Sequence, residues 1–457
     1  MNKIGMFVNS RLAETESLCP VCLAVLPAAI KRRGEEVFIC RTCPEHGLFE
    51  EVIWRGNPSF ESWRRPKQPV EDLRCQSESV RGCPFDCGLC PNHGQHSCTV
   101  LLEITGRCNL RCPVCFADSG KAEPDFIDSA VLIKQMHWIK EQAGDIVLQL
   151  SGGEPTLHPQ LAELTAAAAE IFPAVQLNTN GLLLAEDPQL AGELAQAGLS
   201  WVFLQFDGVS EATFKALRGR ALMGQKLAAI KACEKAGLSV VMVPTVAAGI
   251  NDGELGELFS LALSLSPTVR GVHIQPMTTS GRNNLPGVDR RLTLPEVLMR
   301  LHEQTGGLVK PEDAFPPGCE HERCSFQIRY RRDEHGELRP LSGGSCCARK
   351  TTSEPTSPEE TAENTRRSVD VTIKSWSKPF VPLSGSQSQG DAFDEFLARA
   401  SRETFSLTCM AFQDVWTVDL ARLRGCCVHI FRAPGRLIPF CAMNLTNSEG
   451  HPLHRHA

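Results

Sequence analysis

The stretch Thr105-Gly-Arg-Cys108-Asn-Leu-Arg-Cys112-Pro-Val-Cys115-Phe116 places three cysteines in one loop at a C-x3-C-x2-C spacing. The residues just before it, 99–104 (TVLLEI), are β-branched and apolar, which predicts a buried strand. Three thiolates can hold three irons of a cubane cluster, whereas a closed [4Fe-4S] site takes four. The fourth iron then stays open to another ligand, as in reactive rather than structural metal sites. Cys108, Cys112 and Cys115 are therefore the candidate catalytic residues.

From residue 99 to about residue 277 the sequence alternates strands with helices, which is the rhythm of a parallel sheet. Six such units favour an α/β fold with a partial, TIM-like (β/α)6 barrel over one with the full eight units. Reactive groups gather at the carboxyl ends of barrel strands, where the cysteine loop also lies. The expected strands are 99–105, 146–151, 174–179, 200–206, 239–246 and 270–275, with helices at 129–142, 160–171 and 189–197.

Glycine-rich and polar residues end the strands that follow. Gly152-Gly153-Glu154-Pro155 ends the second expected strand, and taken alone it predicts only a turn. Asn178-Thr-Asn180-Gly ends the third strand, and Gln205-Phe-Asp207-Gly ends the fourth. These polar side chains either line a pocket or serve as ordinary turn residues, and both interpretations stay open. Thr245 and residues 273–275 are further candidates at the ends of the last two strands.

The composition indicates a metalloprotein. The chain has 457 residues, enough for two or three domains, with 42% hydrophobic and 22% charged residues. A net charge of −6 gives no broad basic field, so nucleic acid is not expected as a partner. Residues 1–11 lack the apolar core of a signal peptide, and no apolar run approaches the length of a membrane span, so a cytoplasmic location is expected. In a reducing compartment, 21 cysteines argue for metal ligation.

Cys19-x2-Cys22 and Cys40-x2-Cys43 form two C-x2-C knuckles near the amino terminus. Two such knuckles suit a tetrahedral four-thiolate site for one zinc or one iron. A rubredoxin-like electron-transfer iron and a structural zinc both remain open. Residues 44–47 (PEHG) are expected only to turn the chain.

A second C-x3-C-x2-C motif precedes the barrel, at Cys83, Cys87 and Cys90, and Cys98 follows it. Four available thiols suit a complete auxiliary [4Fe-4S] cluster. The nearby His93 and His96 are expected to be outer residues rather than ligands, since cysteine is the commoner cluster ligand.

Cys319, Cys324, Cys426 and Cys441 provide the thiols of a third four-cysteine cluster, unless some of them are simply buried small hydrophobic residues. Residues 342–390 are rich in Ser, Thr, Pro and charge, which is typical of a mobile linker.

The expected organisation has six parts. They are a rubredoxin-like or zinc-ribbon-like metal-binding domain (1–60), a connector with the auxiliary cluster (61–98), the barrel (99–280), a post-barrel segment (281–341), the Ser/Thr-rich linker (342–390) and a C-terminal helix and hairpin region (391–457).

The three-cysteine loop combined with Gly152-Gly-Glu-Pro155 resembles the radical S-adenosylmethionine (SAM) superfamily. One subgroup is resembled by the double knuckle and by four further stretches, residues 82–94 (GCPFDCGLCPNHG), 205–208 (QFDG), 410–414 (MAFQD) and 438–441 (IPFC). That subgroup contains archaeal tetraether lipid synthase and 7,8-dihydro-6-hydroxymethylpterin methyltransferase. The resemblance covers most of the chain, and the clear departure is the stretch 342–390.

The resemblance implies that SAM binds the open iron of the cluster held by Cys108, Cys112 and Cys115. It implies that an electron donor such as a ferredoxin or flavodoxin drives cleavage to a 5′-deoxyadenosyl radical, which abstracts hydrogen from an unactivated carbon. The residues implied to bind the cofactor are Gly152, Gly153, Glu154, Pro155, Asn178, Asn180, Gln205 and Asp207. Two substrates stay open, a small pterin-like ring for C-methylation and lipid alkyl chains for carbon–carbon coupling. The alternative from another class is a non-catalytic multi-cluster electron-transfer protein.

Overall fold

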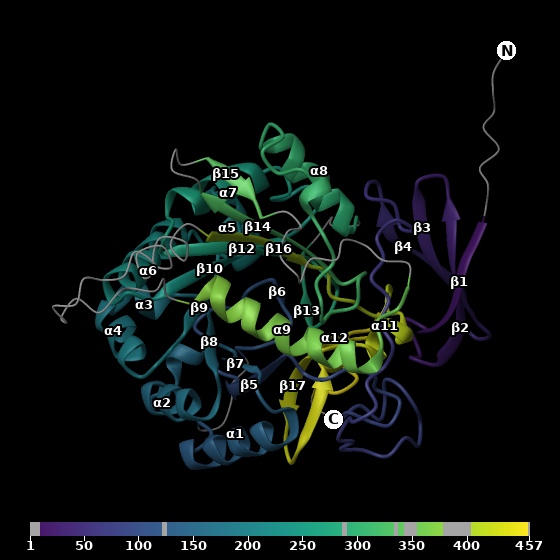
Figure 1. Cartoon of the computed structure of the whole chain (residues 1–457), viewed down its shortest axis with the longest axis horizontal. Coiled ribbons are helices and arrows are strands. Elements are labelled where there is room, and N and C mark those ends of the chain that lie inside the picture. The colour runs from purple at the N-terminus through teal and green to yellow at the C-terminus, as the bar shows by residue number, and fades with distance from the viewer. Residues whose placement is uncertain are drawn as a thin grey trace.

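The computed structural model describes residues 10–120, 126–285, 290–332, 337–341, 354–377 and 404–455. A small antiparallel sheet of four strands lies beside a much larger sheet (Figure 1). The strands of the small sheet are β1 (Ser10–Leu18), β2 (Val25–Arg33), β3 (Glu36–Cys43) and β4 (Gly47–Arg55).

The centre of the large sheet is a barrel of six parallel strands that pair in the order in which they follow along the chain. This confirms the predicted partial (β/α)6 barrel. Most of the strands are buried along their whole length because helices cover their outer face, so their sequences are nearly continuous apolar runs. The strands are β5 (Thr99–Thr105), β7 (Val147–Gly152), β8 (Ala174–Thr179), β9 (Trp201–Gln205), β10 (Ser239–Val243) and β12 (Val269–Pro276).

Helices follow the barrel strands, and Figure 1 shows them around the outside of the barrel. They are α1 (Ser129–Ala143), α2 (Leu161–Ile171), α3 (Leu182–Glu186), α4 (Pro188–Gln196), α5 (Glu211–Arg218), α6 (Met223–Ala236), α7 (Leu255–Ser264) and α8 (Leu294–Gln304). The short elements in the loops are β6 (Val114–Cys115), β11 (Thr245–Val246), β13 (Arg282–Asn283) and the 3-10 turns at Pro155–Leu157 and Pro311–Asp313.

The C-terminal region joins the barrel sheet at both of its edges. Strand β16 (Thr404–Met410) pairs in parallel with β12, and β17 (Val428–Arg432) pairs in parallel with β5. The remaining elements are β14 (Ser325–Arg332), β15 (Leu338–Pro340), α11 (Leu420–Arg424), β18 (Arg436–Pro439) and α12 (Phe440–Asn444). The predicted hairpin is present as β17–β18, whereas the helix expected near 391–400 lies outside the described residues. The tail thus supplies a strand to each edge of the barrel sheet.

Helix α9 (Pro358–Trp376) lies inside the stretch predicted to be a linker, and that prediction is wrong for these residues. Ser357 caps the helix by accepting from the backbone N–H of Glu360, and Pro358 begins it. The buried face of α9 consists largely of polar residues, Thr361, Asn364 and Thr365 among them, so its composition concealed its burial. Figure 1 shows α9 crossing the barrel, where Trp376 packs on Trp201 and Phe203.

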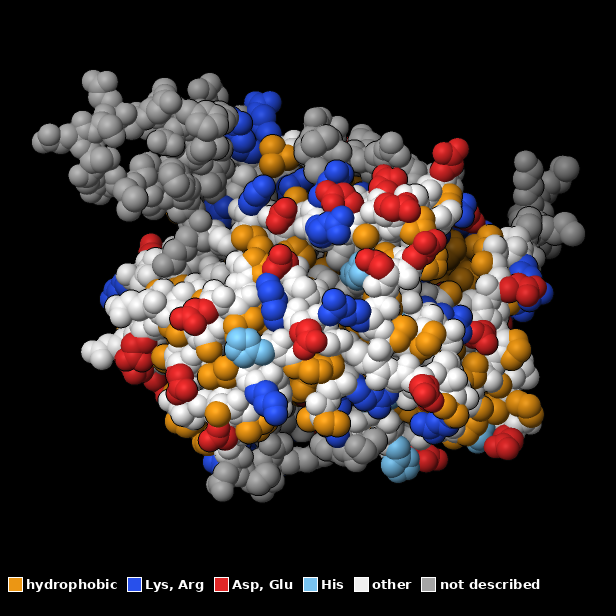
Figure 2. All heavy atoms as spheres, turned by 60° about the horizontal axis from the view of Figure 1, so that its bottom comes forward, with side chains coloured by type: hydrophobic (Ala, Val, Ile, Leu, Met, Phe, Trp, Pro, Cys, Tyr) orange, Lys and Arg blue, Asp and Glu red, His pale blue; other side chains and the backbone are white. Residues whose placement is uncertain are grey.

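Acidic and basic side chains alternate on the face shown in Figure 2, with hydrophobic side chains scattered between them. This mixture agrees with the small net charge of −6. Among the described residues, no helix has both the length and the apolar character required to span a membrane.

Candidate active site and metal centres

The loop of Cys108, Cys112 and Cys115 follows β5, and all three cysteines line one large cavity. Cys115 lies in β6, which pairs with β13. Arg282 of β13 donates from Nε to the Cys112 carbonyl at 2.8 Å and from Nη1 to Asp118 at 2.9 Å. The three-cysteine loop is therefore fixed by a residue that follows the last barrel strand, β12.

Burial sets the protonation of two of these thiols. It raises the pKa of Cys108 to about 12 and also raises the pKa of Cys112. A thiolate at either position therefore requires a positive partner, and a bound iron cluster supplies one. Three clustered thiols at the edge of a cavity fit a cluster with one iron open to a further ligand.

The Gly-Gly-Glu-Pro loop packs directly against the cysteine loop. The backbone N–H of Gly153 donates to the Thr105 carbonyl at 2.7 Å, and that of Glu154 donates to the Arg107 carbonyl at 2.8 Å. A Cβ added at Gly152 would lie 2.1 Å from the Thr105 carbonyl oxygen, and one at Gly153 would lie 2.1 Å from that of Arg107. Glycine is therefore required at both positions because any side chain would prevent the two loops from packing together.

Glu154 uses its buried carboxylate to hold the end of β8. Its Oε1 accepts from the hydroxyl groups of Thr156 and Thr179, each at 2.6 Å, and its Oε2 accepts from the backbone N–H of Asn180 at 2.7 Å. Pro155 begins the 3-10 turn that follows. The structure thus gives Glu154 a positioning function, while contact with a cofactor stays a prediction.

Three of the four polar residues predicted at the strand ends line the cavity: Asn178, Asn180 and Gln205. Asn178 donates to Gln149 Oε1 at 2.9 Å, and Asn180 donates to Asn109 Oδ1 of the cysteine loop at 2.7 Å. Gln205 accepts from the Lys226 ammonium at 2.9 Å.

Asp207 does not line the cavity, and its prediction as a pocket residue is wrong. Its carboxylate lies behind the wall in a bidentate ion pair with Arg218, at 2.6 Å and 2.7 Å. Arg218 also donates to the Val114 carbonyl and to the Thr245 hydroxyl, so it joins the cysteine loop to the strand ends. The Asp207 carboxylate keeps the pKa of Arg218 raised even though burial opposes the charge.

The cavity has a volume of about 410 Å³, and two aromatic groups lie along it. Near the cysteine loop, the Phe116 ring lies 5.6 Å from the Phe412 ring and 5.3 Å from the Phe440 ring. Deeper in the barrel, the Phe203 ring lies 5.2 Å from the His273 ring and 5.5 Å from the Trp376 ring. These two groups give the cavity aromatic surfaces at two depths.

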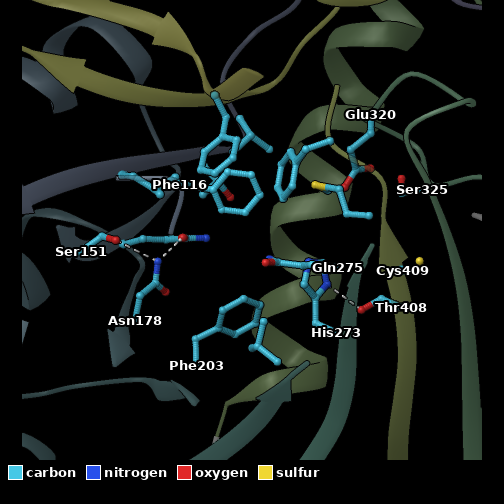
Figure 3. Close-up of a pocket in the computed structure, with 18 of the residues that line it drawn as sticks. Phe116, Ser151, Asn178, Phe203, His273, Gln275, Glu320, Ser325, Thr408 and Cys409 are labelled. Atoms are coloured by element: carbon cyan, nitrogen blue, oxygen red, sulfur yellow. Dashed lines mark hydrogen bonds between the residues drawn. The ribbon is translucent and has the colours of Figure 1, made fainter. Parts of the chain in front are cut away.

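Figure 3 shows Gln275 facing Asn178 across the cavity, with the rings of His273 and Phe203 close to each other. The His273 Nδ1 lies 2.8 Å from the Thr408 hydroxyl of β16. Burial lowers the pKa of His273 to about 4, so its ring is neutral at physiological pH. A neutral imidazole and a neutral carboxamide offer both hydrogen-bond donors and acceptors to a polar ring.

The candidate N-terminal metal centre contains Cys19, Cys22, Cys43 and His46, whose ligand atoms lie within 4.8 Å of one another. His46 Nδ1 lies 3.6 Å from the Cys19 sulfur and 3.4 Å from the Cys43 sulfur. The prediction of Cys40 as the fourth ligand is wrong. Cys40 and Cys43 are three residues apart in β3, so their side chains point to opposite faces of the strand. The sequence signal for His46 is its place three residues after Cys43, in the turn predicted only to reverse the chain.

The three cysteines of the second C-x3-C-x2-C motif gather at a place separate from the three-cysteine loop. Cys83, Cys87 and Cys90 line one small pocket beside His93. Cys98 is not part of that pocket, so the predicted four-thiol set is wrong in its last member. Cys98 directly precedes β5 and contacts Cys427 instead, with the two sulfurs 3.2 Å apart.

The predicted grouping of Cys319 with Cys324, Cys426 and Cys441 is also wrong. The Cys319 sulfur gathers with those of Cys98 and Cys427. Burial raises the pKa of Cys426, and the nearby Cys441 and Cys324 thiols raise it further.

Cys324, Cys426 and Cys441 also have a cation beside them. Arg422 donates from Nη2 to the Cys324 sulfur at 3.3 Å. Cys346 and Cys347, which begin the predicted linker, lie outside the described residues.

Sequence reasoning missed Arg218, Arg282 and Cys427. Arg218 looked like an ordinary basic residue at a helix end, and Arg282 is a lone arginine in a loop. Cys427 adjoins Cys426, and nothing in the local sequence distinguishes the two as ligands. None of the three has a local spacing that identifies its partner.

Comparison with known proteins gives two family matches. The model of the radical SAM superfamily matches residues 102–262, and that of the HMPTM N-terminal zinc ribbon domain matches residues 11–55. The 7,8-dihydro-6-hydroxymethylpterin dimethyltransferase of Methanocaldococcus jannaschii is 32% identical over 95% of this chain and 94% of its own length. The GTP 3′,8-cyclase of Petrotoga mobilis is 31% identical over 52% of this chain and 79% of its own length.

Among solved structures, Streptococcus suis SuiB bound to S-adenosylmethionine is similar, with a TM-score of 0.40 and 15% identity over 49% of this chain and 50% of that one. The match to the Methanocaldococcus jannaschii protein extends over nearly all of both chains and includes both matched family regions. On this evidence the chain is an enzyme of the radical SAM superfamily and belongs to its pterin methyltransferase-like subgroup.

Proposed function

We propose that this enzyme reductively cleaves SAM and uses the resulting radical to methylate a carbon of a pterin-like ring. The observation that carries the proposal is a cavity of about 410 Å³ that extends from the three-cysteine loop to an aromatic group inside the barrel. The methyltransferase of Methanocaldococcus jannaschii, similar over nearly the full length, supports a pterin as the ring.

Cys108, Cys112 and Cys115 would hold the reactive [4Fe-4S] cluster. With SAM bound, the cluster supplies a one-electron reduction and a carbon radical that removes hydrogen from an unactivated carbon. Arg282 and Arg218 keep the cysteine loop in place, and the Gly152-Gly153 turn packs against it. Asn178, Asn180 and Gln205 stand beside this loop as candidate contacts for SAM.

The cavity deeper in the barrel suits a planar, polar ring. Phe203, Trp376 and the neutral His273 offer surfaces for stacking, and Gln275 offers an amide for the ring edge. A volume of about 410 Å³ falls within the usual range for small-molecule sites. Coupling of lipid alkyl chains has less support, because polar side chains interrupt the lining of the cavity. They include the amide of Gln149, the carboxylate of Glu320 and the guanidinium of Arg367.

The test is an anaerobic assay of the reconstituted full chain with SAM, a pterin and a low-potential reductant. Ferredoxin or flavodoxin is the expected donor class, and dithionite replaces it in the assay. A methylene or methyl donor must be included, since SAM is consumed as the source of the radical. We expect 5′-deoxyadenosine to form and the pterin to gain methyl groups, both followed by mass spectrometry.

The variant Cys112→Ala should abolish 5′-deoxyadenosine formation while iron bound elsewhere is retained. Cys233→Ala is the matched control, because Cys233 is a buried cysteine in α6 that lines neither cysteine pocket. Absence of 5′-deoxyadenosine from the wild-type enzyme would refute the proposal. Survival of cleavage in Cys112→Ala would show that the reactive cluster is assigned to the wrong cysteines.

A further inference from the structure

Cys98 and Cys427 are brought together by strand pairing. Cys98 directly precedes β5, Cys427 directly precedes β17, and these parallel strands align Thr99 with Val428. The backbone N–H of Cys98 donates to the Cys427 carbonyl at 2.9 Å, and the two sulfurs lie 3.2 Å apart. Both thiols are therefore fixed at the amino ends of the barrel strands, whereas the three-cysteine loop lies at the carboxyl end of β5.

Cys319 completes the triad from the loop before β14. Its carbonyl accepts from Gln95 Nε2 at 3.0 Å, and Gln95 in turn accepts from the Thr365 hydroxyl of α9 at 3.1 Å. The carbonyl of the next residue, Glu320, accepts from the Lys67 ammonium at 2.7 Å. Such outer hydrogen bonds are typical of loops that hold a metal ligand in place.

The spacing of the three sulfurs fits one ion. They all lie within 4.8 Å of one another. Tetrahedral thiolates at about 2.3 Å from a single zinc lie roughly 3.8 Å apart. Among the described residues, the only other group this compact is the N-terminal Cys19, Cys22, Cys43 and His46 centre, which lies in the zinc-ribbon region.

The reactive cysteines have a wider spacing. In the described structure, Cys108, Cys112 and Cys115 do not gather their sulfurs within the same limit. Each thiolate of a cubane binds a different iron, which separates the sulfurs more than a single ion does. The sulfur spacing of Cys98, Cys319 and Cys427 therefore resembles that of the N-terminal four-residue centre, and not that of the reactive cysteines Cys108, Cys112 and Cys115.

We propose that Cys98, Cys319 and Cys427 bind a single thiophilic divalent ion, with Zn²⁺ as the probe, at the inner end of the cavity. The fourth position faces the cavity, because Cys98, Cys319 and Glu320 line it. The Cys319 thiol donates to Glu320 Oε2 at 3.2 Å, so a carboxylate lies beside one thiol of the triad. Figure 3 shows the Glu320 side chain among the residues around the cavity. Three protein thiolates with an exchangeable fourth position allow the ion to contact a ligand in the cavity.

The first experiment counts zinc and iron per chain in the anaerobically purified enzyme by mass spectrometry. Cys98→Ala and Cys427→Ala should each lose one zinc per chain and keep the wild-type iron content. Cys409→Ala is the matched control, since Cys409 is a buried cysteine beside the same cavity but outside the triad. Loss of iron with zinc retained would show a cluster at this site, and unchanged counts of both metals would show an empty one; either result overturns the proposal.

The second experiment needs no substitution, so it holds even if a variant fails to fold. The wild-type enzyme is treated with a thiol-alkylating reagent before and after zinc chelation, and the modified peptides are identified by mass spectrometry. Cys98 and Cys427 should react only after chelation, and added Zn²⁺ should protect them again. Protection that does not depend on zinc overturns the proposal. Neither experiment relies on the proposed methylation, so the two proposals fail separately.

Discussion

The backbone N–H of Gly153 donates to the Thr105 carbonyl oxygen at 2.7 Å, which joins the ends of β5 and β7 beneath the reactive cysteine loop. A Cβ at Gly153 would lie 2.1 Å from the Arg107 carbonyl oxygen, a distance that no packed atoms tolerate. The glycine thus ties the position of the cysteine loop to that of the neighbouring strand.

Gly153→Ala should therefore displace the cysteine loop and reduce 5′-deoxyadenosine formation at least 100-fold, on the order of what a 1 Å misplacement of reacting groups costs. Anaerobic assay of SAM cleavage by mass spectrometry measures the loss. Gly192→Ala is the control, because a Cβ at this α4 position meets nothing within 4 Å. Full activity in Gly153→Ala would show that the two loops can separate without consequence.

The fourth ligand of the N-terminal centre can be tested directly, because the sequence predicts Cys40 whereas the structure places His46 in the ligand group. His46→Ala should lower the zinc content of the chain by one equivalent, whereas Cys40→Ala should leave it unchanged. The reason is that His46 Nδ1 lies 3.4 Å from the Cys43 sulfur, while Cys40 lies outside the ligand group. Metal analysis of the two purified variants decides between the ligand sets, and zinc loss in Cys40→Ala alone would restore the set expected from the sequence.

The barrel could be predicted because its signals are local. The strand 99–105 and its successors appear as apolar runs separated by helical patterns, and the structure places β5 at Thr99–Thr105. The cysteine groupings could not be predicted, since Cys98 and Cys427 are 329 positions apart and meet only through the pairing of β5 with β17. Cys40 was wrongly predicted as a ligand because its local spacing to Cys43 suggested a shared metal. A C-x2-C spacing places both cysteines on one metal in a tight turn, but not in a regular strand such as β3.

Helix α9 shows a second limit of prediction from sequence, namely that a buried helix can have a polar composition. Composition classified its residues as a linker because Thr361, Asn364 and Thr365 are polar, yet all three are buried. Their polar groups find partners inside the protein; for example, the Thr365 hydroxyl donates to Gln95. A buried helix that uses polar contacts of this kind has no hydrophobic pattern to reveal it.

The ion pair of Asp207 with Arg218 predicts a large stability effect. Asp207→Asn should leave the buried guanidinium without its counter-charge and cost about 3–5 kcal/mol in the free energy of unfolding. Anaerobic urea denaturation measures it. Asp145→Asn, at an exposed pair with Lys140, serves as the control and should change stability by less than about 1 kcal/mol. Equal effects of the two substitutions would show that the buried pair contributes no more than the surface one.

Lys226 predicts a dependence of stability on pH. Its side chain is fully buried, and its ammonium donates to Gln205 at 2.9 Å. Burial lowers the pKa of Lys226 to about 8 in the folded protein, against about 10.4 in an unfolded chain. Between these values the unfolded chain binds the proton and the folded chain does not, so this group makes the free energy of unfolding rise with pH. Below pH 8 both states are protonated, and the full cost of the buried charge is present.

The comparison with Lys226→Met isolates this contribution. The wild type should gain stability relative to the variant as the pH rises from about 8 to about 10.4, by up to roughly 3 kcal/mol. Urea denaturation of both proteins across this range gives the difference in their free energies of unfolding. The substitution also leaves Gln205 without its donor, which shifts this difference at every pH, so the test is how the difference changes with pH. Lys231→Met, which changes an exposed lysine of the same helix, is the matched control for the loss of a lysine from α6. A flat difference for Lys226→Met would mean that the folded protein keeps this ammonium charged, and the hydrogen bond to Gln205 would then compensate for its burial.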